Sequence, residues 1–143
     1  MSLFVVDANV VAKWFVPERL SEEALQLLDG GHQLVTPDLV WSEVGNVLWK
    51  KTRSGELTRS EAVRIAQALA ECPVTVFPSR VLLESALEIA LRTERTVYDS
   101  VYLALAVALE CRLATADERL AHALAGGPLA ECVLWVGAKG AIQ

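Results

Sequence analysis

The sequence predicts an α/β fold, with a doubly wound, mainly parallel five-stranded sheet flanked by helices in three α/β/α layers. Two observations support this prediction. Short, continuous apolar runs of strand type alternate with longer segments of helical periodicity, which is typical of a parallel sheet covered on both faces. At 143 residues, without an internal repeat or a low-complexity tract, the chain is expected to form one domain over residues 1–143.

The predicted strands are short apolar runs that stop at polar residues or proline. The first run ends at Asp7, and the second stops before Pro37. Together the predicted strands cover residues 3–6, 34–36, 74–77, 112–115 and 133–136.

The predicted helices follow from apolar periodicity and from capping residues. Thr58 and Glu61 form a capping box. Thr96 is the expected N-cap of an almost wholly apolar helix, which must be buried on most sides. The predicted helices cover residues 10–15, 21–28, 38–51, 58–71, 80–91, 97–109 and 117–124.

The composition excludes disorder and does not require a membrane. Hydrophobic residues make up 53% of the chain, and the mean hydropathy is +0.36. The longest strongly apolar run, Val101–Leu109, is far shorter than the roughly 18 residues of a membrane-spanning helix. The N-terminus lacks the basic region of a secretory signal, and the three cysteines lack Cys-x-x-Cys spacing. We therefore expect reduced thiols and a cytoplasmic location.

Acidic side chains at the ends of two predicted strands are the first sign of a functional site. Asp7 follows the first strand, and Asp117 lies just past a later one. In open parallel sheets, ligands bind in the crevice outside the carboxyl ends of the strands, where the strand order reverses. The two aspartates are therefore expected to point into one crevice.

Two further carboxylates lie in apolar surroundings. Glu43 is on the apolar face of its helix, and Asp99 is in the first turn of the buried helix. An ionised carboxylate that is removed from water costs several kcal/mol unless it is paired or bound to a cation. Because all these ligands are oxygens, the sequence predicts a hard divalent cation, Mg²⁺ or Mn²⁺.

Each of these acids also has a structural explanation. Asp7 would end a strand, and Glu43 would reach solvent past the edge of its apolar stripe. Asp99 would interact with the helix dipole, and Asp117 would be an N-cap, with Glu118 as a competitor for its role. The prediction of a metal site therefore rests on the set rather than on any one residue.

The segments that carry these acids resemble those of PIN-domain ribonucleases, specifically the VapC toxins of bacterial and archaeal toxin–antitoxin pairs. The order, spacing and length match over essentially the whole chain. Asn9 and Thr115 match small polar positions that support the acidic site of the family. The matching segments are residues 5–9, Pro37 with residues 42–44, residues 98–106 and residues 114–117.

The resemblance implies a PIN-like fold and a metal-dependent endoribonuclease. A metal-activated water would cleave RNA and leave 5′-phosphate and 3′-hydroxyl ends. Asp7 and Asp99 would be the main metal ligands, with Glu43 and Asp117 completing the shell. The resemblance also implies a homodimer and a cognate antitoxin, which would bind a groove at the early helices near residues 14–16.

Contacts with RNA are harder to assign. Three basic residues around the turn after the Glu43 helix are candidates for holding the phosphate backbone, although a solvated helix end explains them equally well: Lys50, Lys51 and Arg53. The net charge of −5 neither excludes nor supports nucleic acid. If four of the 18 acidic residues bind metal, the remaining 14 nearly balance the 13 basic residues.

Other functions remain open from the sequence alone. A Mg²⁺-dependent phosphotransfer or phosphatase domain also gathers aspartates at strand ends, but such a phosphatase needs an aspartate at the position of Asn9. A non-catalytic interaction module would use its acids only as caps and for solubility. A metal-free ribonuclease would need two positioned imidazoles, whereas His32 and His122 are expected in a turn and on an ordinary helix.

Overall fold

The computed structural model describes residues 2–142, and one sheet of five strands runs through them. The strands are β1 (Leu3–Val6), β2 (Gln33–Pro37), β3 (Thr75–Phe77), β4 (Arg112–Thr115) and β5 (Val133–Trp135). Their order is β3-β2-β1-β4-β5, and every neighbouring pair is parallel. The predicted fold class is confirmed, and the sheet is wholly rather than mainly parallel.

Seven α-helices connect these strands within the described residues. They are α1 (Ala8–Phe15), α2 (Ser21–Asp29), α3 (Leu39–Arg53), α4 (Arg59–Ala68), α5 (Leu83–Thr93), α6 (Val97–Ala108) and α7 (Glu118–Leu124). Short 3₁₀ turns cover Leu69–Glu71, Ser79–Leu82 and Ala130–Cys132.

Three of the differences between predicted and observed helix boundaries have identifiable causes. The first helix begins at Ala8 rather than residue 10, because the Asp7 side chain caps it. The helix predicted to reach residue 71 ends in a 3₁₀ turn, and Cys72 is then extended, as a residue before proline prefers. The helix predicted over 80–91 begins as a 3₁₀ turn, where the backbone N–H of Ser79 donates to Asp38.

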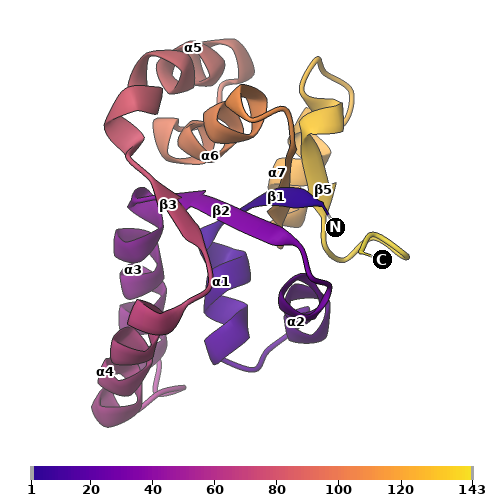
Figure 1. The fold of residues 1–143 in the computed structure, drawn as a ribbon. Helices are drawn as coiled ribbons and strands as arrows, with labels where there is room; N and C mark the ends of the chain where they lie inside the picture. Colours follow the sequence, from indigo (N-terminus) through magenta and orange to yellow (C-terminus); the bar gives the residue numbers. More distant parts are fainter. Residues whose placement is uncertain (1, 143) are drawn as a thin grey trace.

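The helices cover both faces of the sheet. Figure 1 shows α1, α2, α3 and α4 on one side of the strands and α5 and α6 on the other. Successive residues of β1 alternate between these layers: Phe4 and Val6 pack in the core with α1 to α4, and Val5 packs in the core with α5 and α6. Burial on both faces explains why the strands are continuous apolar runs.

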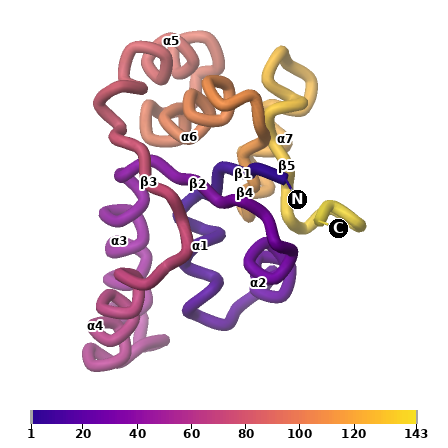
Figure 2. Tube along the Cα trace, viewed as in Figure 1, coloured from indigo at the N-terminus to yellow at the C-terminus, as the bar shows by residue number. Residues whose placement is uncertain are grey.

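The strand order reverses at the centre of the sheet. From β1 the chain crosses first to β2 on one side and later to β4 on the other. The traces of β1 and β4 lie side by side in Figure 2, and Val6 is in register with Ala114. The residues that follow these two strands therefore meet at one edge of the sheet, where such folds bind ligands.

The helices and the cysteines bear on two expectations, that the chain needs no membrane and that its thiols are reduced. Among residues 2–142, no helix combines the length and the apolar character that crossing a membrane would require. Cys72, Cys111 and Cys132 are free thiols, each half-buried.

Candidate functional site

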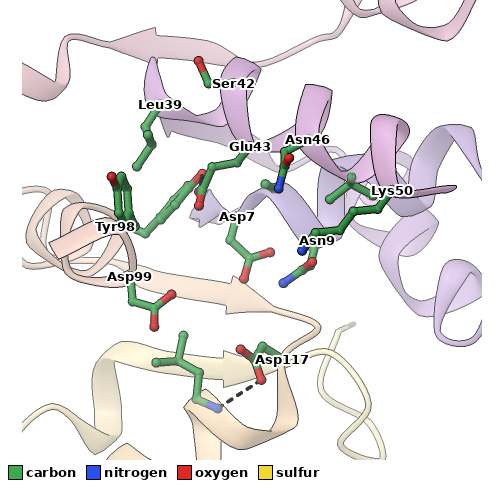
Figure 3. A pocket seen from close by; sticks show the side chains of 14 residues that line it. Asp7, Asn9, Leu39, Ser42, Glu43, Asn46, Lys50, Tyr98, Asp99 and Asp117 are labelled. Atoms are coloured by element: carbon green, nitrogen blue, oxygen red, sulfur yellow. Dashed lines mark hydrogen bonds between the residues drawn. The ribbon is translucent and has the colours of Figure 1, made fainter. Parts of the chain in front are cut away.

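A cavity of about 420 Å³ opens at the carboxyl ends of β1 and β4 and is walled by α3 and α6. All four predicted carboxylates line it, and Figure 3 shows the labelled acids directed toward one space. We call this cavity the carboxylate pocket. It is lined by Asp7, Ala8, Asn9, Leu39, Ser42, Glu43, Asn46, Val47, Lys50, Tyr98, Asp99, Tyr102, Asp117 and Leu120.

Asp7 is the most buried of the four acids, with 7% of its surface exposed. One carboxylate oxygen accepts a hydrogen bond from the backbone N–H of Val10 at 3.0 Å, and the other accepts from the Thr115 hydroxyl. Burial raises the pKa of Asp7 from 3.8 to about 6. The two hydrogen bonds lower this pKa, while the charges of Asp117 and Glu43 raise it.

Thr115 connects two of the acids. Its hydroxyl donates to Asp7 and accepts a hydrogen bond from the backbone N–H of Asp117 at 3.0 Å. This contact follows from the parallel register, which sets the end of β4 beside the end of β1. One hydroxyl therefore joins the Asp7 carboxylate to the backbone of Asp117.

Asp117 caps a helix and also faces the cavity, which are the two settings that the sequence left open. It is the N-cap of α7, where its carboxylate accepts from the backbone N–H groups of Arg119 at 3.0 Å and Leu120 at 3.2 Å. It also lines the carboxylate pocket. Glu118, its competitor in the sequence, lies beyond the pocket and forms an exposed ion pair with Arg19.

Glu43 faces the pocket from α3. Its carboxylate accepts a hydrogen bond of 2.6 Å from the hydroxyl of Tyr102 on α6. Burial raises the pKa of Glu43, the hydrogen bond from Tyr102 lowers it, and the charge of Asp99 raises it. This hydrogen bond therefore joins α3 and α6, which lie on either side of the pocket.

Asp99 enters the pocket from the first turn of α6, which Thr96 caps through a 3.1 Å hydrogen bond from the Asp99 backbone N–H. The Asp99 carboxylate is paired with Arg95 at 3.1 Å, and about a third of the side chain is exposed. Asp99 therefore already has a cationic neighbour, which is itself partly exposed.

Polar residues on α3 extend the pocket away from the acids. Ser42, Asn46 and Lys50 follow one another at four-residue spacing, and Asn9 lies near Lys50 in Figure 3. No role was predicted for Asn46 or for Tyr102 from the sequence. Their spacing was a usable signal, because Asn46 follows Glu43 by three residues and Tyr102 follows Asp99 by three residues.

The three candidate RNA-binding residues are in different settings. Lys50 lines the pocket. The Lys51 ammonium, whose side chain is only 13% exposed, is paired with Glu18 and with Glu56. The Arg53 guanidinium lies over the Trp49 ring, 4.9 Å from its centroid. Of the three, only Lys50 is part of the carboxylate pocket.

The donor set fits a hard cation, although not as a complete coordination shell. Carboxylate, amide and hydroxyl oxygens dominate the polar lining, which suits Mg²⁺ or Mn²⁺. Within residues 2–142, no three His, Cys, Asp or Glu side chains already form a ready metal-binding group. A cation in this pocket would therefore keep several water ligands, as Mg²⁺ usually does, or would draw the acids inward.

The histidines lie outside this site. The Nδ1 atom of His32 accepts a hydrogen bond from the Ser2 backbone at 3.2 Å, and the ring packs edge-on against Phe4. His122 is exposed on α7. Neither lines the pocket, so the geometry does not provide the paired imidazoles of a metal-free ribonuclease.

Comparisons with known proteins point to one family. The family model described as PIN domain matches residues 4–124. Ribonuclease VapC3 of Pyrobaculum aerophilum is 39% identical over 120 residues, which cover 82% of this chain and 92% of that protein. Ribonuclease VapC9 of Mycobacterium tuberculosis is 33% identical over 118 residues, with 82% and 88% covered.

A solved structure agrees at the level of the fold. The toxin–antitoxin complex from Klebsiella pneumoniae matches with a TM-score of 0.65 at 19% identity, and the match covers 93% of this chain and 97% of that chain. At this identity the likeness concerns the fold alone.

Proposed function

The chain belongs to the PIN-domain family, among its VapC ribonucleases, and we therefore propose that it is an endoribonuclease toxin whose carboxylate pocket cleaves RNA with the help of Mg²⁺ or Mn²⁺. The observation that carries the proposal is the meeting of Asp7, Glu43, Asp99 and Asp117 around one cavity. They come from four segments separated in the sequence. Membership of this family removes the reason to propose a phosphotransfer or phosphatase domain.

The acids are proposed to hold the cation, with Asp7 and Asp99 as the main ligands and Glu43 and Asp117 completing the shell. A divalent cation would lower the pKa of a water for attack and offset charge on the scissile phosphate. The Thr115 hydroxyl and the Val10 backbone N–H fix the orientation of the Asp7 carboxylate. Asn9 supplies a further polar group at the edge of the same cavity.

The RNA strand is proposed to follow α3 away from the acids. Lys50 is the basic residue that lines the pocket, and its ammonium is suited to a backbone phosphate. Asn46 lies between Lys50 and Glu43 on the same helix face. Lys51 and Arg53 are given no RNA contact in this proposal, because their charges are engaged with Glu18 and Trp49.

The antitoxin is proposed to bind an apolar groove on the α1–α4 layer, in the cytoplasm. Phe15 and Val16, which were predicted from the sequence to lie at the antitoxin groove, line a cavity of about 330 Å³ together with Leu57 and Ile65. Trp14 does not line this cavity. Its indole N–H donates to the Ala24 carbonyl at 2.8 Å, and its ring packs against the core beneath the groove. The likeness to a toxin–antitoxin complex supports this part of the proposal at the level of the fold.

A homodimer is proposed through the opposite layer. Three leucines at four-residue spacing are exposed on α5: Leu83 at 55%, Leu87 at 46% and Leu91 at 74%. Such a row on one helix face can pair with the same row of a second copy about a two-fold axis.

Cleavage of total cellular RNA tests the proposed activity. The unmodified chain is expected to cleave RNA with Mg²⁺ or Mn²⁺ and to stop when EDTA is added. Asp7→Asn and Asp99→Asn should each reduce the rate at least about 100-fold, the size expected when activity depends on one metal ligand. Glu118→Gln is the matched control, because Glu118 is an exposed acid outside the pocket.

Three results would contradict the proposal: cleavage that survives EDTA, full activity in either aspartate variant, or an equal loss in Glu118→Gln. A non-catalytic interaction module makes a different prediction for the folded chain. If the chain were such a module, adding Mn²⁺ would leave its Tm unchanged. A cation that binds only the folded state of the proposed nuclease must raise the Tm.

A further inference from the structure

Tyr102 is buried and yet reaches the carboxylate pocket. Its side chain is 3% exposed and packs in the core between the sheet, α5 and α6. It follows Asp99 by three residues, so both side chains lie on the same face of α6. Its ring therefore belongs to the core, while its hydroxyl belongs to the wall of the pocket.

The Tyr102 hydroxyl donates to one carboxylate oxygen of Glu43, with 2.6 Å between the oxygens. Within the described part of the chain, Glu43 accepts no other hydrogen bond and forms no ion pair. The two residues are 59 positions apart and come from α3 and α6, on opposite walls of the pocket. This single contact sets where the Glu43 carboxylate lies.

Glu43 needs such a contact because its surroundings repel it. The charge of Asp99 acts against ionised Glu43, and the charge of Glu43 acts against Asp7. A glutamate has three rotatable side-chain bonds, so without a fixed partner it would turn toward solvent and away from the other acids. A hydrogen bond from a buried hydroxyl to a carboxylate is strong enough to oppose this rotation.

We propose that Tyr102 is a positioning residue, whose hydroxyl holds Glu43 by one oxygen and leaves the other oxygen free to serve the cation. This inference rests on the proposed function, since it assigns Tyr102 a role at the same site. Tyr102 does not itself contact the cation or the RNA. It acts through the geometry of Glu43.

Tyr102→Phe tests the proposal by removing only the hydroxyl. The affinity of the RNA-free protein for Mn²⁺, measured by isothermal titration calorimetry, is expected to fall about tenfold, as when a hydrogen bond that orients a metal ligand is lost. The Tm in EDTA should change by less than about 4 °C, because the ring still fills the core. Raising the Mg²⁺ concentration should restore most of the RNA cleavage rate.

Tyr98→Phe is the matched control on the same helix. Tyr98 lines the same pocket but is 62% exposed, and within residues 2–142 its hydroxyl makes no hydrogen bond. This variant should bind Mn²⁺ like the unmodified chain. An equal loss of affinity in both tyrosine variants would overturn the proposal, because it would indicate a general effect of the aromatic lining.

A double-mutant cycle with Glu43→Gln separates positioning from a merely structural role. If Tyr102 acts through Glu43, the double variant should bind Mn²⁺ no more weakly than Glu43→Gln alone. Independent, additive losses would overturn the proposal.

Unchanged affinity in Tyr102→Phe would overturn this inference alone, provided that the unmodified chain binds Mn²⁺. Failure of the unmodified chain to bind Mn²⁺ would overturn both this inference and the proposed metal site. If Tyr102→Phe does not fold, a crystal structure of the unmodified chain with Mn²⁺ replaces it. One Glu43 oxygen should then accept from the Tyr102 hydroxyl while the other faces the cation, and a Glu43 carboxylate that has left the Tyr102 hydroxyl would overturn the inference.

Discussion

Asp7 is a buried acid, and keeping its carboxylate ionised in the metal-free fold costs free energy. Two hydrogen bonds satisfy its oxygens, but its pKa of about 6 indicates that they do not offset burial and the neighbouring charges. Such a residue is easier to explain by a ligand than by folding, because a protein selected only for stability would not keep a charge there.

In the metal-free protein, the contribution of Asp7 to stability should therefore fall as the pH rises. Between the ordinary pKa of 3.8 and the folded pKa of about 6, folded Asp7 holds a proton that the unfolded chain has released. The free energy of unfolding then falls through this window and stays low above it, by on the order of 3 kcal/mol. Asp7→Asn removes this titration, so in EDTA it should be more stable than the unmodified chain near neutral pH.

Urea unfolding in EDTA at about pH 4 and pH 7 measures this difference. At the lower pH the two proteins should be close, since Asp7 is then mostly protonated. Glu118→Gln, which changes an exposed acid, should show no such pH-dependent gain. A destabilised Asp7→Asn variant at neutral pH would contradict the prediction, even though the same variant is expected to be inactive.

Single residues were predictable where their surroundings in the sequence were unusual. The four acids were identifiable because they interrupt apolar segments, and the structure brings all four to one cavity. The pairing of Lys51 with Glu18, 33 residues away, left no trace in local spacing. The contact between Tyr102 and Glu43 was hidden for the same reason, since it depends on how α3 and α6 meet.

At the scale of elements, the first turn of α6 places one of the four acids, Asp99, in the pocket. Thr96 caps this turn at the Asp99 backbone N–H, and its carbonyl accepts from the Ser100 hydroxyl at 2.7 Å. Thr58 caps α4 in the same way, through the Glu61 backbone N–H at 3.1 Å, but α4 contributes nothing to the pocket. The two caps form a natural pair for comparison.

Thr96→Ala and Thr58→Ala should destabilise the protein to a similar extent, by about 1 kcal/mol each. In a chain of this length the Tm should fall by about 4 °C. Only Thr96→Ala should also weaken Mn²⁺ binding, because it loosens the turn that holds Asp99. Thermal melts in EDTA together with calorimetric titration distinguish the two effects. Equal Mn²⁺ affinity in both variants would show that the cap does not fix Asp99.

Element types were predictable, while some boundaries were not. Apolar periodicity and the capping box at Thr58 and Glu61 are local, so the sequence contains them. The dual use of Asp117, as N-cap and as pocket lining, was left open because a cap and a ligand look alike in sequence. The start of α5 depends on Ser79 meeting Asp38, a contact across 41 residues.

For the whole molecule, the strand order matters most to function. Predicting a parallel sheet required only alternating strands and helices, whereas the order β3-β2-β1-β4-β5 depends on which edges pair in space. That order sets β1 between β2 and β4, so the segments after β1 and β4 meet. The helices that follow β2 and precede β4 then close the pocket from its two sides.

The exposed leucines of α5 lead to a prediction about assembly. Leu83, Leu87 and Leu91 lie on the layer opposite the proposed antitoxin groove, so a second copy can cover them without closing that groove. A stable dimer buries about 800 Å² on each partner, and a charge at the middle of such a face should prevent it. Leu87→Glu is therefore expected to convert a dimer into a monomer in analytical ultracentrifugation. Val63→Glu, at an exposed apolar residue of α4, should leave the dimer intact. A monomeric unmodified chain, or a dimer that survives Leu87→Glu, would contradict this assignment of the interface.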